Sequence, residues 1–130
     1  MAYPVILEND LLRVEEVREQ QTIIVRRLPD RAPDTATLIG TYQEALAASS
    51  IFKGWSVILD VREAPPRNDH EFESALGAMR KKLDAVFVRV VTLVATAAGA
   101  LQVRRFAREN GREALVTHDE DEALRMCRER

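Results

Sequence analysis

The sequence predicts an α/β domain with a mixed β-sheet, which opens with a β-hairpin, continues with later parallel strands and is accompanied by about four helices. Three observations support this prediction. Short apolar runs rich in β-branched residues recur along the chain, apolar residues at helical spacing separate them, and a polar break divides the first two runs. Because strands that alternate with helices usually pair in parallel through right-handed crossovers, the later strands are expected to be parallel.

Length and composition indicate one domain over residues 1–130. Hydrophobic residues make up 46% of the chain and charged residues 31%, which suits a packed core and a solvated surface. The net charge of -2 argues against nucleic acid as a partner, since binding to phosphates usually needs a strongly basic face. The longest apolar stretch, residues 86–101, contains Arg89 and is shorter than the roughly 20 residues that a bilayer requires. Residues 1–10 do not resemble a signal peptide, so we expect a cytoplasmic protein without membrane insertion.

The first third of the chain predicts the hairpin. Residues 11–17 and 22–28 have the composition of strands, and the polar residues 18–21 between them form the turn. Residues 5–7 are expected to add a short extended piece.

A helix and a buried strand follow. Asp34 suits the N-cap of the helix because its carboxylate can accept hydrogen bonds from unpaired backbone N–H groups. Residues 49–54 are expected to end this helix. Residues 55–61 form a short apolar run between two helices, which is typical of a buried parallel strand.

The second helix is expected to open at Asn68, which forms a pair resembling a capping box with Glu71. The basic residues 80–82 are expected in its last turn, where they oppose the helix dipole. Its buried stripe comprises Phe72, Leu76, Met79 and Leu83.

Residues 86–96 are nearly continuous in valine and predict a central strand. Arg89 is expected near the beginning of this strand, within reach of solvent, because an unpaired buried charge is costly. Residues 97–99 are expected to form a tight turn. A helix over residues 100–110 follows, with Gly111 as the residue just beyond its end.

The chain closes with a short strand over residues 114–116 and a helix that starts at Asp119. The apolar residues of this last helix are Ala123, Leu124 and Cys127. Cys127 is the only cysteine, so the chain can form no internal disulfide and has no Cys/His zinc pattern.

The order of the expected elements, a β-hairpin followed by alternating helices and strands, resembles that of the STAS (anti-sigma-factor-antagonist) family. This family includes SpoIIAA-like and Sec14-like bacterial single-domain proteins. Residues 54–61 look like the third strand of the family, which often ends in an Asp between apolar residues, here Asp60. Residues 114–124 look like its closing strand and helix. The resemblance implies a STAS fold and a non-catalytic regulatory module that binds an unidentified protein partner.

One segment departs from the family pattern. Anti-sigma-factor antagonists carry a phosphorylatable serine in an Asp-Ser-Ser-Gly-like stretch at the start of the second helix. The corresponding residues 67–70 contain no hydroxyl group, and Ser74 lies one turn further along, inside the expected helix. The resemblance therefore implies a partner-binding surface at this place without the serine phosphoswitch.

Two loops, residues 62–68 and 96–99, are expected at the carboxyl ends of the parallel strands, where ligands and partners of α/β sheets tend to bind. Each loop leads into a helix N-terminus, which presents free N–H groups. The candidate residues for binding a partner or an anion are Arg62, Arg67, Asn68, Asp69, Thr96 and Gly99. A purely structural alternative stays open, in which Asn68 caps the helix and the arginines pair with Glu63 or Asp69.

We expect no enzymatic activity, cofactor or bound metal. His70, Glu71 and Glu73 would diverge around a helix instead of sharing one face. The sequence has neither a Gly-x-Ser-x-Gly elbow nor a phosphate-binding GxxxxGK[ST] loop. Two functions stay open, a protein-binding module and a small-ligand or anion-binding (nucleotide or lipid-like) domain that uses the same loops. Homodimerisation through an edge strand of the hairpin or through a helix face is compatible with both.

Overall fold

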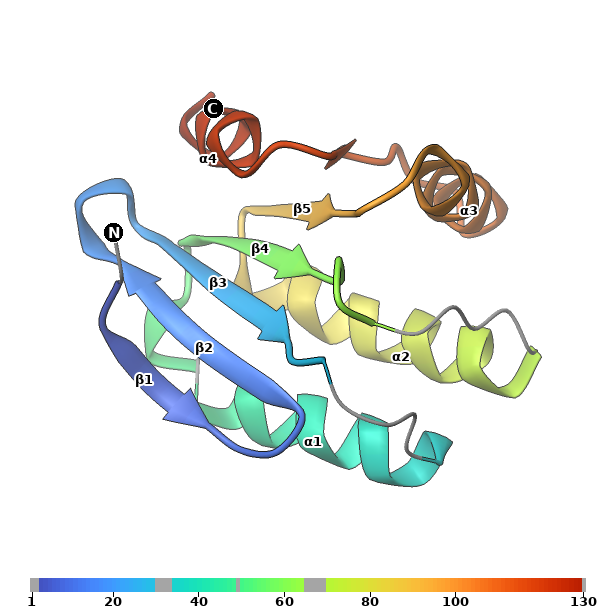
Figure 1. Ribbon diagram of the computed structural model, residues 1–130, viewed down its shortest axis with the longest axis horizontal. Coiled ribbons are helices and arrows are strands. Elements are labelled where there is room, and N and C mark those ends of the chain that lie inside the picture. The colour runs from blue at the N-terminus through green and yellow to red at the C-terminus, as the bar shows by residue number, and fades with distance from the viewer. Residues whose placement is uncertain (1–2, 30–33, 49, 65–69, 130) are drawn as a thin grey trace.

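The computed structural model describes residues 3–29, 34–48, 50–64 and 70–129, and these form a six-stranded sheet with helices on both faces (Figure 1). The elements in chain order are β1 (Val5–Glu8), β2 (Leu12–Val17), β3 (Thr22–Arg27), α1 (Thr35–Ala48), β4 (Ser56–Asp60), α2 (His70–Val86), β5 (Arg89–Leu93), α3 (Ala97–Glu109), β6 (Val116–Thr117) and α4 (Glu120–Arg128). Two single 3₁₀ turns, Arg18–Gln20 and Ser50–Phe52, complete the list.

The strands lie in the sheet in the same order as in the sequence, β1-β2-β3-β4-β5-β6. The pairs β1–β2 and β2–β3 are antiparallel, and the pairs from β3 to β6 are parallel. The predicted α/β class, with a mixed sheet that opens antiparallel and continues parallel, is thus confirmed. Among the described residues, no helix combines the length and the apolar character that crossing a membrane requires.

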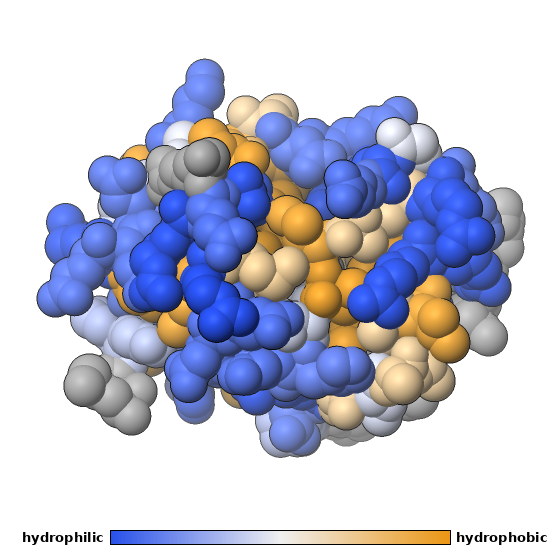
Figure 2. Space-filling view, turned by 90° about the horizontal axis from the view of Figure 1, so that it is seen from above, coloured by the Kyte–Doolittle hydropathy of each residue, from blue (hydrophilic) through white to orange (hydrophobic). Residues whose placement is uncertain are grey.

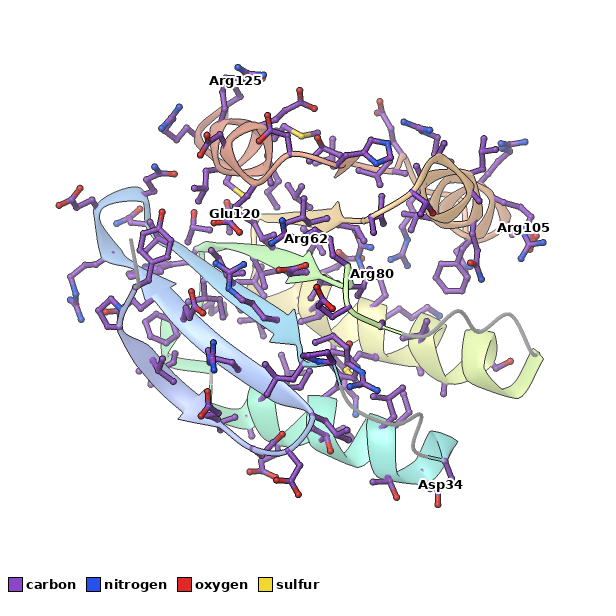
Figure 3. The ribbon with its side chains drawn as sticks, in the orientation of Figure 1. Asp34, Arg62, Arg80, Arg105, Glu120 and Arg125 are labelled. Atoms are coloured by element: carbon purple, nitrogen blue, oxygen red, sulfur yellow. The ribbon has the colours of Figure 1, made fainter. Side chains whose placement is uncertain are left out.

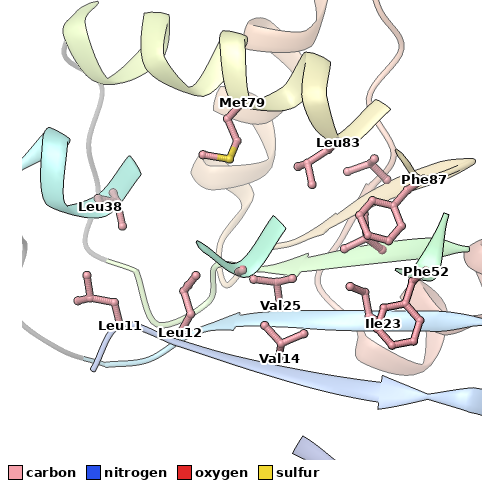
Figure 4. Packing of buried hydrophobic residues seen from close by; sticks show 13 residues of the cluster. Leu11, Leu12, Val14, Ile23, Val25, Leu38, Phe52, Met79, Leu83 and Phe87 are labelled. Atoms are coloured by element: carbon pink, nitrogen blue, oxygen red, sulfur yellow. The ribbon is translucent and has the colours of Figure 1, made fainter. Parts of the chain in front are cut away.

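Two layers of helices cover the sheet, with α1 and α2 on one face and α4 on the other (Figure 1). Side chains alternate between these faces because successive residues of a strand point in opposite directions. In β3, Ile23 and Val25 pack with α1 and α2 (Figure 4), whereas Ile24 packs with α4. The closing helix contributes Ala123, Leu124 and Cys127 to that second cluster, as the sequence predicts.

The helix ends follow the capping residues that the sequence indicates. Asp34 Oδ1 accepts a hydrogen bond from the N–H of Thr37 at 2.7 Å, and Asp119 Oδ1 accepts one from the N–H of Asp121 at 2.9 Å. Gly111 has φ 69° just after α3, a left-handed conformation that glycine adopts without strain. Asn68, the expected cap of α2, lies outside the described residues.

The boundary between β5 and α3 differs from the prediction. Residues 97–99 do not form a tight turn, because Thr96 Oγ1 accepts a hydrogen bond from the N–H of Gly99 at 3.0 Å and thereby caps α3. These residues are the first turn of the helix, which alanine favours. The strand is shorter than predicted, and β5 is an interior strand next to the β6 edge.

The second helix is longer than predicted and ends at Val86, so the basic residues 80–82 lie inside it and its last turn has no basic residue. Helical hydrogen bonding extends as far as Phe87, whose N–H donates to Leu83 O at 2.8 Å. Burial of Phe87 under the sheet explains the extension, because tertiary packing outweighs the dipole pattern. In the predicted stripe, Met79 and Leu83 are buried and Leu76 is half-buried, while the Phe72 side chain lies outside the described part.

The last strand, β6, is a two-residue edge strand that begins two residues later and ends one residue later than the predicted residues 114–116. It lies between α3 and α4, and Figure 2 shows hydrophobic side chains gathered between the hydrophilic surfaces of the two helices. A short edge flanked by helices offers little backbone for pairing with another chain.

Candidate functional site

The carboxyl ends of β3 and β4 place two opposite charges side by side on the α4 face of the sheet. Arg26 and Asp60 are direct partners in the parallel register. Each lies two residues after a buried isoleucine, Ile24 or Ile58, that packs with α4. Because the side-chain period of a strand is two, Arg26 and Asp60 must face α4 as well.

Arg26 binds three acidic side chains from three different elements. Its Nε donates to Glu15 Oε2 at 2.9 Å, and its Nη1 donates to Asp60 Oδ2 at 2.9 Å and to Glu120 Oε1 at 2.7 Å. Glu15 and Asp60 are almost fully buried, and only 18% of the Arg26 side chain is exposed. Arg26 therefore ties β2, β4 and the first residue of α4 together.

Arg62, the first predicted contact residue, belongs to the same group. Its Nε and Nη2 donate to the two oxygens of Asp60 at 3.0 and 2.9 Å, and its Nη2 also donates to Glu120 Oε1 at 3.1 Å. Figure 3 shows Arg62 beside Glu120 near the ends of β3 and β4. The structural alternative expected this arginine to pair with Glu63 or Asp69, but its partners among the described residues are Asp60 and Glu120, and Asp69 lies outside them. Arg62 is the most exposed member of this group, with 35% of its side chain accessible.

We call Glu15, Arg26, Asp60, Arg62 and Glu120 the charged cluster. Burial alone would raise the pKa of Asp60, but hydrogen bonds from Arg62 and Arg26 outweigh it and hold that pKa below its ordinary value. The hydrogen bond from Arg26 lowers the pKa of Glu120. Burial works to lower the pKa of Arg26, and the bonds to Glu120, Glu15 and Asp60 raise it overall. With three carboxylates and two guanidiniums, the charged cluster carries one net negative charge.

The loop after β4 is fixed by its own aspartate and by β5. The backbone N–H of Arg62 donates to Asp60 Oδ1 at 3.2 Å, and the N–H of Val61 donates to Leu93 O at 3.0 Å. Val61 also packs with Val94 and Ala100, which flank the start of α3. The two loops predicted to lie at one edge of the sheet are therefore neighbours.

The structure describes three of the six predicted site residues. Arg62 lies in the charged cluster. Thr96 is the N-cap of α3 and Gly99 is in its first turn, so the two are joined to each other by a capping hydrogen bond. Arg67, Asn68 and Asp69 lie outside the described residues.

Sequence reasoning missed three members of the charged cluster, Glu15, Arg26 and Glu120. A signal was present, because Glu15 and Arg26 are charged residues that directly follow the buried valines Val14 and Val25 within their strands. A buried charge in such a position needs a partner of opposite sign. Which partner it finds depends on strand register, and the composition does not give the register.

The described residues contain no group of three His, Cys, Asp or Glu side chains placed to hold a metal ion. The carboxylates of Glu15, Asp60 and Glu120 instead converge on Arg26. This arrangement fixes α4 and the first residues after β4 in place. The exposed residues after β4 and at the start of α3 are left free to contact another molecule.

Comparison with known proteins gave no match among family models, curated proteins or solved structures.

Proposed function

We propose that this chain is a non-catalytic STAS-like module that binds a protein partner at the carboxyl edge of its sheet, without the serine phosphoswitch of the family. The strand order supports the STAS-like fold. Antiparallel strands open the sheet, and β3 to β6 then follow in chain order with one helix between each pair. The resemblance of the sequence rests on the order of the elements along the chain and on residues 54–61 and 114–124.

The observation that supports the proposal best is that hydrogen bonds hold residues 61 and 62 after β4 and the first turn of α3 at the carboxyl edge. Asp60 holds the loop after β4 through the backbone and side chain of Arg62, and Thr96 holds the start of α3. A surface that is ordered before binding loses little conformational entropy on association. Glu63, Ala97 and Ala98 are exposed on this surface and are available for contact.

The position of Ser74 supports a module without the phosphoswitch. Helix α2 begins at His70, so Ser74 lies in its second turn and is exposed. A phosphate there would sit along the helix, away from the N-terminal N–H groups that stabilise negative charge at a helix start.

The alternative function, binding of a small anion at this edge, is less well supported than binding of a protein partner. Arg62 already directs its Nε and Nη2 donors to Asp60 and Glu120. An anion that approached Arg62 would meet these two carboxylates and the net negative charge of the charged cluster. Contacts to a protein surface do not require Arg62 to give up its partners.

The test uses exposed positions, because Arg62→Glu would also disturb the charged cluster. Ala98→Arg changes the first turn of α3, and Glu63→Lys changes the loop after β4. The matched controls are Ala85→Arg and Glu113→Lys, which make the same changes at exposed positions of α2 and of the segment after α3.

Each variant is immobilised, and proteins retained from a lysate of the source cells are compared by quantitative mass spectrometry. We expect a partner that the wild type and both controls retain and that Ala98→Arg and Glu63→Lys lose, with circular dichroism unchanged. Equal retention by all five proteins would exclude this edge as the binding surface. A large rise in melting temperature with nucleotides or lipids, abolished by the same two variants, would favour the small-ligand alternative.

The edge strand β1 is poorly suited to pairing two copies of the chain. Its register with β2 shifts between Val5 and Leu7, and Pro4, whose carbonyl accepts a hydrogen bond from Glu16, precedes it. Bulges and prolines on an edge strand discourage pairing with another sheet. Sedimentation velocity of the wild type tests whether a dimer forms by this or another surface.

A further inference from the structure

Two arginines share one carboxylate between α2 and the segment that follows α3. Arg80 Nε lies 3.4 Å from Asp84 Oδ1, and Arg112 Nη1 lies 3.3 Å from Asp84 Oδ2. Figure 3 shows Arg80 in the region between α2 and α3. Only 17% of each arginine side chain is exposed, whereas 48% of the Asp84 side chain is exposed.

Backbone geometry fixes the three side chains near one another. Arg80 and Asp84 are one helical turn apart on α2, so they share a face of that helix. Arg112 follows Gly111, whose left-handed conformation turns the chain after α3, and its N–H donates to Ala107 O at 2.9 Å. The position of Arg112 is therefore set by the end of α3.

The two guanidiniums are not fully compensated. Among the described side chains, two positive charges face one negative charge, which leaves a net charge of plus one in a half-buried place. Arg112 Nη1 is buried and has no hydrogen-bond partner among the described residues, because its contact with Asp84 lacks hydrogen-bond geometry. Burial, aided by the charge of Arg112, lowers the pKa of Arg80. A buried donor without a partner is uncommon in folded proteins and requires an explanation.

We propose that Arg80 and Arg112 form a binding site for an oxyanion, either a phosphoryl group or a carboxylate. Such a group supplies the missing negative charge and the missing acceptor for Arg112 Nη1. Guanidinium groups suit this chemistry because their planar N–H donors match the oxygens of phosphate and carboxylate.

This site is separate from the carboxyl edge. Arg80 and Asp84 lie in the second half of α2 and Arg112 lies beyond the end of α3, whereas Arg62 precedes α2. The proposal therefore does not depend on the proposed function, and the two can fail independently.

The test titrates the protein with inorganic phosphate and, separately, with acetate, at constant ionic strength maintained with sodium chloride. Binding is followed by the shift of arginine Nε–Hε signals in proton–nitrogen correlation spectra and by the melting temperature. We expect saturable shifts at Arg80 and Arg112 with at least one of the two anions. Saturation by phosphate alone assigns a phosphoryl ligand, saturation by acetate alone assigns a carboxylate, and saturation by neither overturns the proposal.

Three variants complete the test. Arg112→Gln should weaken anion binding about tenfold or more, the usual loss for a hydrogen bond to a charged group. Arg125→Gln, which removes an exposed arginine of α4, should leave binding unchanged. Asp84→Asn removes the competing carboxylate and leaves both arginines in place, so it should bind the anion more tightly than the wild type. Unchanged binding in Asp84→Asn would contradict the site even if Arg112→Gln failed to fold.

Discussion

Arg26 on β3 donates a hydrogen bond of 2.7 Å from Nη1 to Oε1 of Glu120, the first residue of α4, across 94 positions of sequence. The same guanidinium binds Glu15 of β2 and Asp60 of β4. One side chain thus connects the opening hairpin, the parallel part of the sheet and the closing helix. The charged cluster, the burial of Tyr42 and the cap of α3 lead to four predictions.

Replacing Arg26 should destabilise the fold more than replacing any exposed arginine. Arg26→Ala leaves the buried carboxylates of Glu15 and Asp60 with fewer partners, and breaking such a group costs about 3 kcal/mol. Arg125→Ala, which removes an exposed ion pair with Glu122, should cost less than about 1 kcal/mol. Urea denaturation of both variants measures the difference, and equal midpoints would show that the charged cluster does not contribute to stability.

Stability should fall in acid because of Asp60 and Glu120. The folded state lowers the pKa of both groups, from ordinary values of 3.8 and 4.5. Their stabilising contribution is therefore complete above the ordinary pKa values and is lost as the pH falls through the lower values of the folded state. The free energy of unfolding, measured by urea denaturation at a series of pH values, should decline below about pH 5. Glu120→Gln should reduce the slope of this decline, and a slope identical to that of the wild type would assign the acid sensitivity to other carboxylates.

Tyr42 on α1 should lose its proton at a higher pH than an ordinary tyrosine. Burial raises its pKa from 10.0 to about 12. Since the unfolded state loses this proton first as the pH rises, stability should decrease between the two values. The ultraviolet absorbance of tyrosinate reports the titration directly, and Tyr42→Phe should remove the late step. A late step that persists in Tyr42→Phe would be incompatible with this assignment.

Thr96 should contribute to stability as the cap of α3. Thr96→Ala removes the oxygen that accepts the N–H of Gly99 and should cost about 1 kcal/mol. Thr96→Ser keeps an oxygen in the same place and should retain most of that stability. Chemical denaturation separates the two, and an equal loss in both variants would point to the threonine methyl group instead of the cap.

Much of the fold could be predicted from local signals. The hairpin, the first helix cap at Asp34, the closing helix at Asp119 and the terminating Gly111 all follow from rules that involve a few neighbouring residues. The predicted start of the third helix at residue 100 was wrong, because residues 97–99 are compatible with a turn as well as with the first turn of a helix. The hydrogen bond from Gly99 to Thr96 decides between them.

The candidate site was predicted in part. The sequence placed Arg62 and Thr96 at one edge of the sheet, and the structure brings their loops together through Val61 and Leu93. The sequence did not reveal that Asp60 and Glu120 hold Arg62. Glu120 is remote in sequence and reaches Arg62 only when α4 packs on the sheet.

The sequence by itself determined the α/β class, the alternation of strands and helices and most of the helix ends, because these depend on periodicity and on contacts between near neighbours. Only the tertiary structure decided which charges meet. The partnership of Arg26 with Asp60 depends on strand register, and its partnership with Glu120 depends on the docking of α4. A register shift of one residue would turn Arg26 to the opposite face of the sheet, and no local pattern in the sequence fixes that choice.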